Sequence, residues 1–338
     1  MNKELSPKNN KDFHEISTII SEAKEKVWQQ INTVLINLYW RIGEFIAQKV
    51  EYDGWGKGTV EELSDYILAR APNVRGFSAR NIWRMKQFYE AYREHEKLST
   101  LLTEVSWSNH LHILSKTKTP EEKEFYLSLG SKHKFSAREF ARLIDSATYE
   151  RTLLADKNAP SVIKNFPEET QGIFRDSYVF EFLGLPDEHK EDDLRKALLR
   201  HFKQFLLELG HDFSFIGEEY VVQVGMKDFR IDLLLYHRGL NCLTAIELKV
   251  SEFQPEYLGK LQFYLEALDR DVKKPHENPS IGILICKTKD DEVVKYALSR
   301  NVSPTMIAEY ETKLIDKKLL QKKLHELSIE SDISPDDY

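Results

Sequence analysis

Two carboxylates and an amine lie at short spacing within two apolar runs of the chain. Asp232 belongs to the run 229–236, and Glu247 and Lys249 belong to the run 242–250. Both runs are rich in β-branched and aromatic residues, which favour strands. Charged side chains in such strands need partners, and a divalent cation is the simplest partner for two carboxylates that face each other.

A tight connection between the two runs would bring these side chains together. If Gly239 and Leu240 form a two-residue type II′ hairpin loop, with glycine at its first position, Asp232 pairs with Glu247. Opposed side chains on one face have Cβ atoms about 4.5 to 5.5 Å apart, where two like charges destabilise the sheet. Lys249 falls on the same face, because side chains alternate along a strand. The spacing therefore predicts one site with two carboxylates and an ammonium group.

Metal-assisted hydrolysis of a phosphodiester is the chemistry that suits this set of groups. We expect Asp232, Glu247 and the backbone carbonyl of Leu248 to bind Mg²⁺, or Mn²⁺, which polarises a phosphate and activates water. Lys249 would orient or deprotonate that water, or stabilise charge on the phosphoryl oxygens. Glu208, near the end of the preceding helical segment, is a candidate for a further ligand or hydrogen-bond acceptor.

The surrounding periodicity predicts an α/β domain that positions these groups. The expected elements are a helix, three strands, a second helix and a fourth strand, over residues 190–209, 220–224, 229–236, 242–250, 256–268 and 281–286. A helical crossover between the third and fourth strands makes those two strands parallel in one sheet.

Asp232 followed by Glu247-Leu248-Lys249 resembles the signature of the PD-(D/E)XK nuclease superfamily and its restriction-endonuclease-like αβββαβ core. The flanking sequence resembles the YhcG-like family of bacterial nucleases with a helical N-terminal domain, over residues 39–43, 54–56, 75–78, 107–108, 232–237, 245–249 and 253–260. The resemblance covers nearly the whole chain. It implies that Asp232, Glu247 and Lys249 are catalytic and that Glu208 occupies the upstream acidic position of the superfamily.

One position departs from the superfamily pattern. Related nucleases often carry Gln four residues before a Tyr on the helix after the ExK motif, and here Lys260 precedes Tyr264. Lys260 can contact a phosphate, so we expect the substitution to change the fine geometry of the site more than the class of reaction.

The first half of the chain predicts an all-α domain over residues 1–155, joined by a linker over 155–167 to the nuclease-like domain 156–338. Apolar residues at steps of three and four indicate one long helix that ends near Val50. Further helices are expected over residues 60–71 with Thr59 as cap, 79–92 with Ser78 as cap, 107–116, 120–129 and 136–154.

The segment from Val60 to Tyr92 resembles a helix-turn-helix, and its second helix with the approach to it carries mostly basic charges. Arg80 and Arg84 share one helix face, and Arg75 precedes them, so all three are candidates for contacts with nucleic acid. The alternative is a basic, solvated face of a helical bundle that forms a homodimer. Any pair of short helices can imitate the motif, so both interpretations stay open.

The net charge of the chain argues, at first, against a nucleic-acid partner. The chain has 48 Lys+Arg and 55 Asp+Glu, a formal net charge of −7. Residues 1–150 hold 22 basic and 21 acidic residues, which leaves 26 and 34 for the rest, so the split is +1 and −8. The total is thus an average over unlike parts, and its sign is weak evidence about partners.

The sequence also argues against a membrane span, a secretory signal and a cysteine metal site. No run of 18 apolar residues occurs, so no membrane span is expected, and the first residues lack a secretory pattern, which predicts a cytoplasmic protein. Cys242 and Cys286 have no metal-like spacing.

We therefore expect a cytoplasmic, Mg²⁺-dependent nuclease acting on DNA. The alternative is a catalytically inactive nuclease-fold protein that binds DNA or takes part in an assembly.

Overall fold

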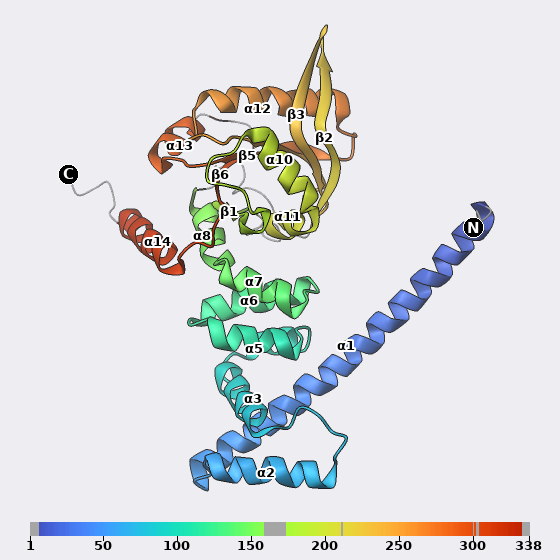
Figure 1. Ribbon diagram of the computed structural model, residues 1–338, viewed down its shortest axis with the longest axis vertical. Helices are drawn as coiled ribbons and strands as arrows, with labels where there is room; N and C mark the ends of the chain where they lie inside the picture. The colour runs from blue at the N-terminus through green and yellow to red at the C-terminus, as the bar shows by residue number, and fades with distance from the viewer. Residues whose placement is uncertain (1–6, 159–173, 211, 300, 302–303, 333–338) are drawn as a thin grey trace. The chain divides into compact units, whose positions relative to one another are not determined.

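The computed structural model describes residues 7–158, 174–210, 212–299, 301 and 304–332. The chain divides into two units, residues 1–144 and 145–338, and most of their elements are labelled in Figure 1. The boundary lies before α8 (Thr148–Asn158), whereas the sequence placed it at residue 156. Most of the predicted linker is outside the described residues, and α8 occupies its first part.

The first unit is all-α, as predicted. Its helices are α1 (Pro7–Tyr52), α2 (Lys57–Arg70), α3 (Ala79–Tyr92), α4 (Ser99–Leu102), α5 (Trp107–Lys116), α6 (Pro120–Lys132) and α7 (Ala137–Asp145). Ser78 caps α3 by accepting a hydrogen bond from the N–H of Asn81. The predicted cap of α2 is wrong: this helix begins after Gly56, so Thr59 lies within its first turn. None of the described helices is both long and apolar enough to cross a membrane.

A close approach between α1 and α3 organises the core of this unit. A Cβ added at Gly43 would lie 2.1 Å from the carbonyl oxygen of Met85, so only glycine allows the two helices to come this near. The apolar stripe of α3 includes Ile82, Met85 and Tyr92, which are buried. Tyr89 is partly exposed, and Phe88 is buried as well.

The second unit is built on a mixed sheet of six strands in the order β1-β6-β5-β4-β3-β2. The strands are β1 (Ser177–Val179), β2 (Phe213–Val224), β3 (Lys227–His237), β4 (Cys242–Leu248), β5 (Asn278–Cys286) and β6 (Thr305–Glu311). Strands β2, β3 and β4 are antiparallel neighbours, and β4 and β5 are parallel, as the crossover predicted. This is the αβββαβ core with β6 and β1 added at one edge.

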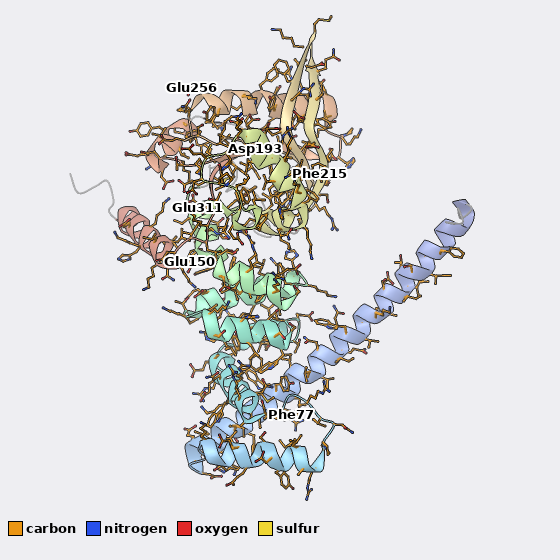
Figure 2. All side chains as sticks on the ribbon, in the orientation of Figure 1. Phe77, Glu150, Asp193, Phe215, Glu256 and Glu311 are labelled. Carbon is orange, nitrogen blue, oxygen red and sulfur yellow. The ribbon has the colours of Figure 1, made fainter. Side chains whose placement is uncertain are left out.

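Both faces of this sheet are apolar, and helices cover each of them. One face packs on α10 (Glu191–Arg200) and α11 (Phe202–Leu209), and the other on α12 (Glu256–Ala267). Figure 2 shows Asp193 on α10 and Glu256 at the start of α12. Neighbouring residues of β3 alternate between the two cores, with Leu233 on the α11 side and Leu234 on the α12 side.

The remaining helices of this unit are α8, α13 (Asp291–Leu298) and α14 (Lys317–Asp332). The single helix predicted over 190–209 is wrong in one respect, since the backbone of His201 (φ −104°, ψ 35°) leaves the helical region and divides it into α10 and α11. The break lets each short helix turn its own apolar residues, Leu194 and Leu198 on one and Phe205 and Leu209 on the other, into the same core.

Candidate active site

The register between β3 and β4 is the predicted one. Leu233 pairs with Ile246 and His237 with Cys242, so Asp232 and Glu247 are the next opposed residues beyond the ladder. The predicted loop is wrong: Arg238–Asn241 form a four-residue turn, and its left-handed residue is Asn241 (φ 50°), not Gly239. The predicted two-residue loop and the observed four-residue turn are both centred between Gly239 and Leu240, so they give the same strand register.

At the end of the β3–β4 ladder, the side chain of Asp232 takes the place of a backbone hydrogen-bond acceptor. Its Oδ2 accepts a hydrogen bond of 2.8 Å from the backbone N–H of Leu248. Burial, and then the negative charge of Glu247, raise the pKa of Asp232 to about 6. The two carboxylates therefore interact, as the sequence predicted for opposed acids.

Glu247 is fully buried and is surrounded by lysines. Its Oε1 lies 3.1 Å from Nζ of Lys249 and also forms an ion pair with Lys260 of α12. Its Oε2 is buried and has no hydrogen-bond partner among the described residues. Burying a carboxylate oxygen without a hydrogen bond has a high desolvation cost, and a cation is a suitable partner for such an oxygen.

Lys249 follows β4 and is held at several points. Its backbone N–H donates to the carbonyl oxygen of Ile285 at 2.8 Å. Its Nζ lies 3.1 Å from Glu247, from Glu191 and from the carbonyl oxygen of Leu248. Burial lowers the pKa of Lys249, but the charges and hydrogen bonds of Glu247 and Glu191 outweigh it, so the pKa is raised. Lys249 is therefore an ammonium ion at neutral pH.

Glu208 does not join this site. It is buried on α11, where it forms an ion pair with Arg151 of α8 and accepts a hydrogen bond of 2.9 Å from the N–H of Val179 in β1. Strands β5 and β6 separate β1 from β4, so Glu208 lies at the other edge of the sheet. The expectation of an upstream acidic residue at Glu208 is corrected by this placement.

Glu191, in the first turn of α10, is the upstream acid that the structure brings to Lys249. The sequence offered a weak signal for it, because Glu191, Asp192 and Asp193 form an acidic first turn. Such turns are favoured by the helix dipole alone, which explains them without a function.

The four candidate contacts for nucleic acid lie in different units. Arg75 is in the connection 71–78, and Arg80 and Arg84 are on α3 of the first unit, where Arg75 and Arg80 are exposed. These three side chains form no hydrogen bond or ion pair with the described residues. The connection is longer than the three or four residues typical of a helix-turn-helix. Lys260 lies at Glu247 in the second unit.

The donor set fits a hard divalent cation. Mg²⁺ commonly takes one or two carboxylates from a protein and keeps several waters, and Asp232 and Glu247 supply two carboxylates with one buried, unpartnered oxygen. No group of three or more His, Cys, Asp or Glu side chains suited to a metal occurs among the described residues. The carbonyl oxygen of Leu248, predicted as a ligand, accepts a hydrogen bond from Lys249.

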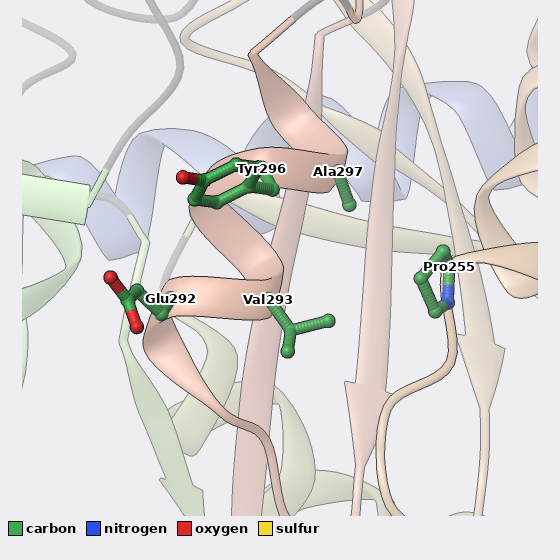
Figure 3. Close-up of a pocket in the computed structure, with 5 residues that line it drawn as sticks. All are labelled: Pro255, Glu292, Val293, Tyr296 and Ala297. Carbon is green, nitrogen blue, oxygen red and sulfur yellow. The ribbon is translucent and has the colours of Figure 1, made fainter.

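One hollow of about 560 Å³ lies outside these contacts. It is lined by Pro255, which precedes α12, and by four residues of α13: Glu292, Val293, Tyr296 and Ala297 (Figure 3). Tyr296 is 77% exposed. None of the predicted site residues lines this hollow.

Comparison with known proteins gives matches over both halves of the chain. Residues 171–325 match the family described as the YhcG PDDEXK nuclease domain, and residues 15–151 match the DUF1016 N-terminal domain. The chain is 30% identical to the protein of Escherichia coli (strain K12) named "Putative nuclease YhcG", over 90% of this chain and 91% of that protein.

A solved structure, that of a repair endonuclease from Pyrococcus abyssi, is 17% identical and covers 37% of this chain and 48% of that chain. Its TM-score is 0.25.

Proposed function

The chain belongs to the YhcG family, in which a DUF1016 N-terminal domain precedes a PDDEXK nuclease domain, and from this membership we propose a nuclease that depends on Mg²⁺ or Mn²⁺ and cleaves DNA. The observation that carries the proposal is the pair of opposed carboxylates, Asp232 and Glu247, beside the ammonium group of Lys249. Such a pair in a sheet costs stability, and a metal ion is its natural compensation.

Each residue has a proposed part in the reaction. Asp232 and Glu247 hold the metal, which supplies Lewis-acid polarisation of the phosphate when bound. Lys249 donates hydrogen bonds to the attacking water or to a phosphoryl oxygen. Its raised pKa favours this role over that of a base, because a protonated amine cannot accept a proton. Glu191 keeps the Lys249 ammonium in place.

The test compares cleavage of single-stranded, duplex and branched DNA and of RNA, in Mg²⁺, Mn²⁺ or chelator. Asp232→Ala and Lys249→Ala should lose cleavage, by a factor of about a hundred or more. Asp228→Asn, an exposed carboxylate on the same strand, is the matched control and should keep it. Cleavage in chelator, or full activity of both site variants, would refute the mechanism.

The second candidate is an inactive nuclease-fold protein that binds DNA. The ion pair of Lys260 with Glu247 favours it, because that lysine occupies part of the carboxylate on which metal chemistry depends. Tight binding of DNA without cleavage under any of these metal conditions would support this candidate over the first.

Arg75, Arg80 and Arg84 are proposed to contact the phosphate backbone. The exposure of Arg75 and Arg80 and the partial exposure of Arg84 support the proposal, and the nearby Lys86 is engaged with Glu90. Neutral substitution of all three should weaken DNA binding and reduce its dependence on salt, since each phosphate contact releases counterions. Lys57→Gln, a more remote lysine in the same unit, serves as the control.

We also propose that α1 pairs with α1 of a second copy. This helix carries exposed apolar residues at steps of three, four and seven along one side: Phe13, Ile16, Ile20, Val27, Ile31, Val34 and Leu38. Such spacing is what pairing with another long helix requires. Sedimentation should detect a dimer, and Ile20→Glu with Val27→Glu should dissociate it, whereas Glu22→Gln should not.

A further inference from the structure

Two lysines share one buried carboxylate oxygen, and they are held very differently. Lys249 has a side chain only 12% exposed and also contacts Glu191 and a backbone carbonyl. Lys260 has a side chain 45% exposed, and among the described residues it forms an ion pair with Glu247 alone. Its Nζ also lies 5.4 Å from the centre of the Tyr264 ring. Lys249 is therefore anchored, whereas Lys260 can turn toward solvent by rotating its own side chain.

Lys260 also lies within the electrostatic reach of both carboxylates. Its ammonium group forms an ion pair with Glu247, and its charge and that of Asp232 act on each other. Lys260 thus neutralises part of the negative charge that a metal shared by these two residues would neutralise.

We propose that the ammonium group of Lys260 and a divalent metal ion compete for Glu247, so that metal binding releases Lys260 from this carboxylate. The inference rests on the proposed metal-dependent nuclease. Two like charges a few ångströms apart repel strongly in a partly buried site. Glu247 Oε1 already accepts from two ammonium groups, so the metal gains a full carboxylate only when the more mobile of them leaves.

The released lysine has a use in the same reaction. It lies on α12 beside the metal ligands, and an ammonium group freed there can bind a phosphate oxygen of the nucleic acid. Metal and nucleic acid would then each favour the state in which Lys260 has left Glu247, and each would increase the affinity for the other.

Chemical labelling of the unaltered protein tests this without any cleavage assay. An amine-acylating reagent is applied in chelator and in saturating Mg²⁺, and the rate at each lysine is measured by mass spectrometry. Release from Glu247 should raise the rate at Lys260 severalfold, because an amine that has left its ion pair is more accessible to the reagent. Lys295, exposed on α13, should react equally in both conditions. An unchanged rate at Lys260 while Mg²⁺ is bound would overturn the proposal.

Substitution of Lys260 supplies the second test, read as Mg²⁺ affinity by calorimetry. Lys260→Met should bind Mg²⁺ about tenfold more tightly, as expected when a competing charge next to a carboxylate is removed. Lys260→Arg keeps the competitor and should stay near the unaltered protein.

The calorimetry also separates this inference from the proposed function. Equal or weaker binding by Lys260→Met would overturn the competition while leaving the metal site intact. No Mg²⁺ binding by the unaltered protein or by any variant would refute the metal site itself. If Lys260→Met does not fold, the labelling of the unaltered protein decides alone.

Discussion

At the scale of single residues, the arrangement of the site has an electrostatic cost. Asp232 and Glu247 are opposed acids at the ends of adjoining strands, and burial with mutual repulsion raises the pKa of Asp232 to about 6. The lysines around Glu247 offset part of this cost. Stability is lower than it would be without the pair, which is typical of sites selected for chemistry.

Removing the charge of Asp232 should therefore stabilise the metal-free protein. The folded pKa lies above the unfolded value, so stability falls as pH rises between about 4 and 6 and stays low above this window. In chelator at about pH 7.5, Asp232→Asn should raise the free energy of unfolding by on the order of 2 kcal/mol, and the gain should vanish near pH 4. Denaturant unfolding at both pH values measures it. A loss of stability at the higher pH would contradict the assignment.

The affinity for Mg²⁺ should depend on the same protonation of Asp232, but it should rise with pH over the range in which stability falls. A ligand carboxylate must lose its proton before it binds a cation, and Asp232 holds its proton up to about pH 6. Mg²⁺ affinity should be level above that pH and fall about tenfold per unit below it. Calorimetry from about pH 5 to 8 measures this, with Asp232→Asn as the variant that lacks the inflection. A level affinity across the range would exclude Asp232 as a ligand.

The sequence predicts those site residues whose positions follow from local pairing. Asp232, Glu247 and Lys249 lie in two strands joined by a short turn, so alternation and register place them. Glu191 comes from a helix far away in the sequence, and its contact with Lys249 depends on how α10 packs on the sheet. No local pattern encodes that packing, which is also why Glu208 was an equally reasonable candidate.

At the scale of elements, the sequence succeeds where periodicity is strong and fails where tertiary contacts decide. The limits of α3 follow from the Ser78 cap and the apolar stripe, and β5 follows from its apolar run. The early start of β2 at Phe213 and the break at His201 depend on pairing with β3 and on packing against the core. These contacts join residues that are distant in sequence.

The approach of α1 to α3 gives a prediction at this scale. Gly43→Ala places a Cβ against the backbone of Met85, which cannot move aside as a side chain can. We expect a loss of about 1 to 3 kcal/mol in the free energy of unfolding. The matched control is Gly58→Ala in α2, where nothing lies within 4 Å of the added atom. That change should be neutral or slightly stabilising, because alanine favours a helix. Equal effects of the two changes would refute the close contact.

At the scale of the whole molecule, each unit has its own core, and the unequal charges of the two halves follow this division. The near-neutral half carries Arg75, Arg80 and Arg84, and the acidic half carries the carboxylates of the site. The division places Arg151 of α8, which is bonded to Glu208 of α11, in the second unit.

Two truncations that differ by α8 test the boundary. A chain that begins at residue 145 keeps Arg151, which is fully buried and bonded to Glu208 and to the carbonyl oxygen of Ser177. A chain that begins at residue 156 removes Arg151, the cation paired with the buried Glu208 carboxylate, which costs about 3 to 5 kcal/mol. We expect the longer piece to fold and to keep metal-dependent cleavage, and the shorter piece to unfold at much lower denaturant concentration.

Glu208→Gln in the shorter piece should recover part of this loss, because the amide carries no charge and can still accept the hydrogen bond from Val179. The same substitution in the longer piece should destabilise it, because Arg151 then loses the carboxylate that neutralises it. Opposite effects of one substitution in two pieces of the chain are what a buried ion pair across α8 and α11 requires. Equal stability of the two pieces would instead place α8 outside the nuclease unit.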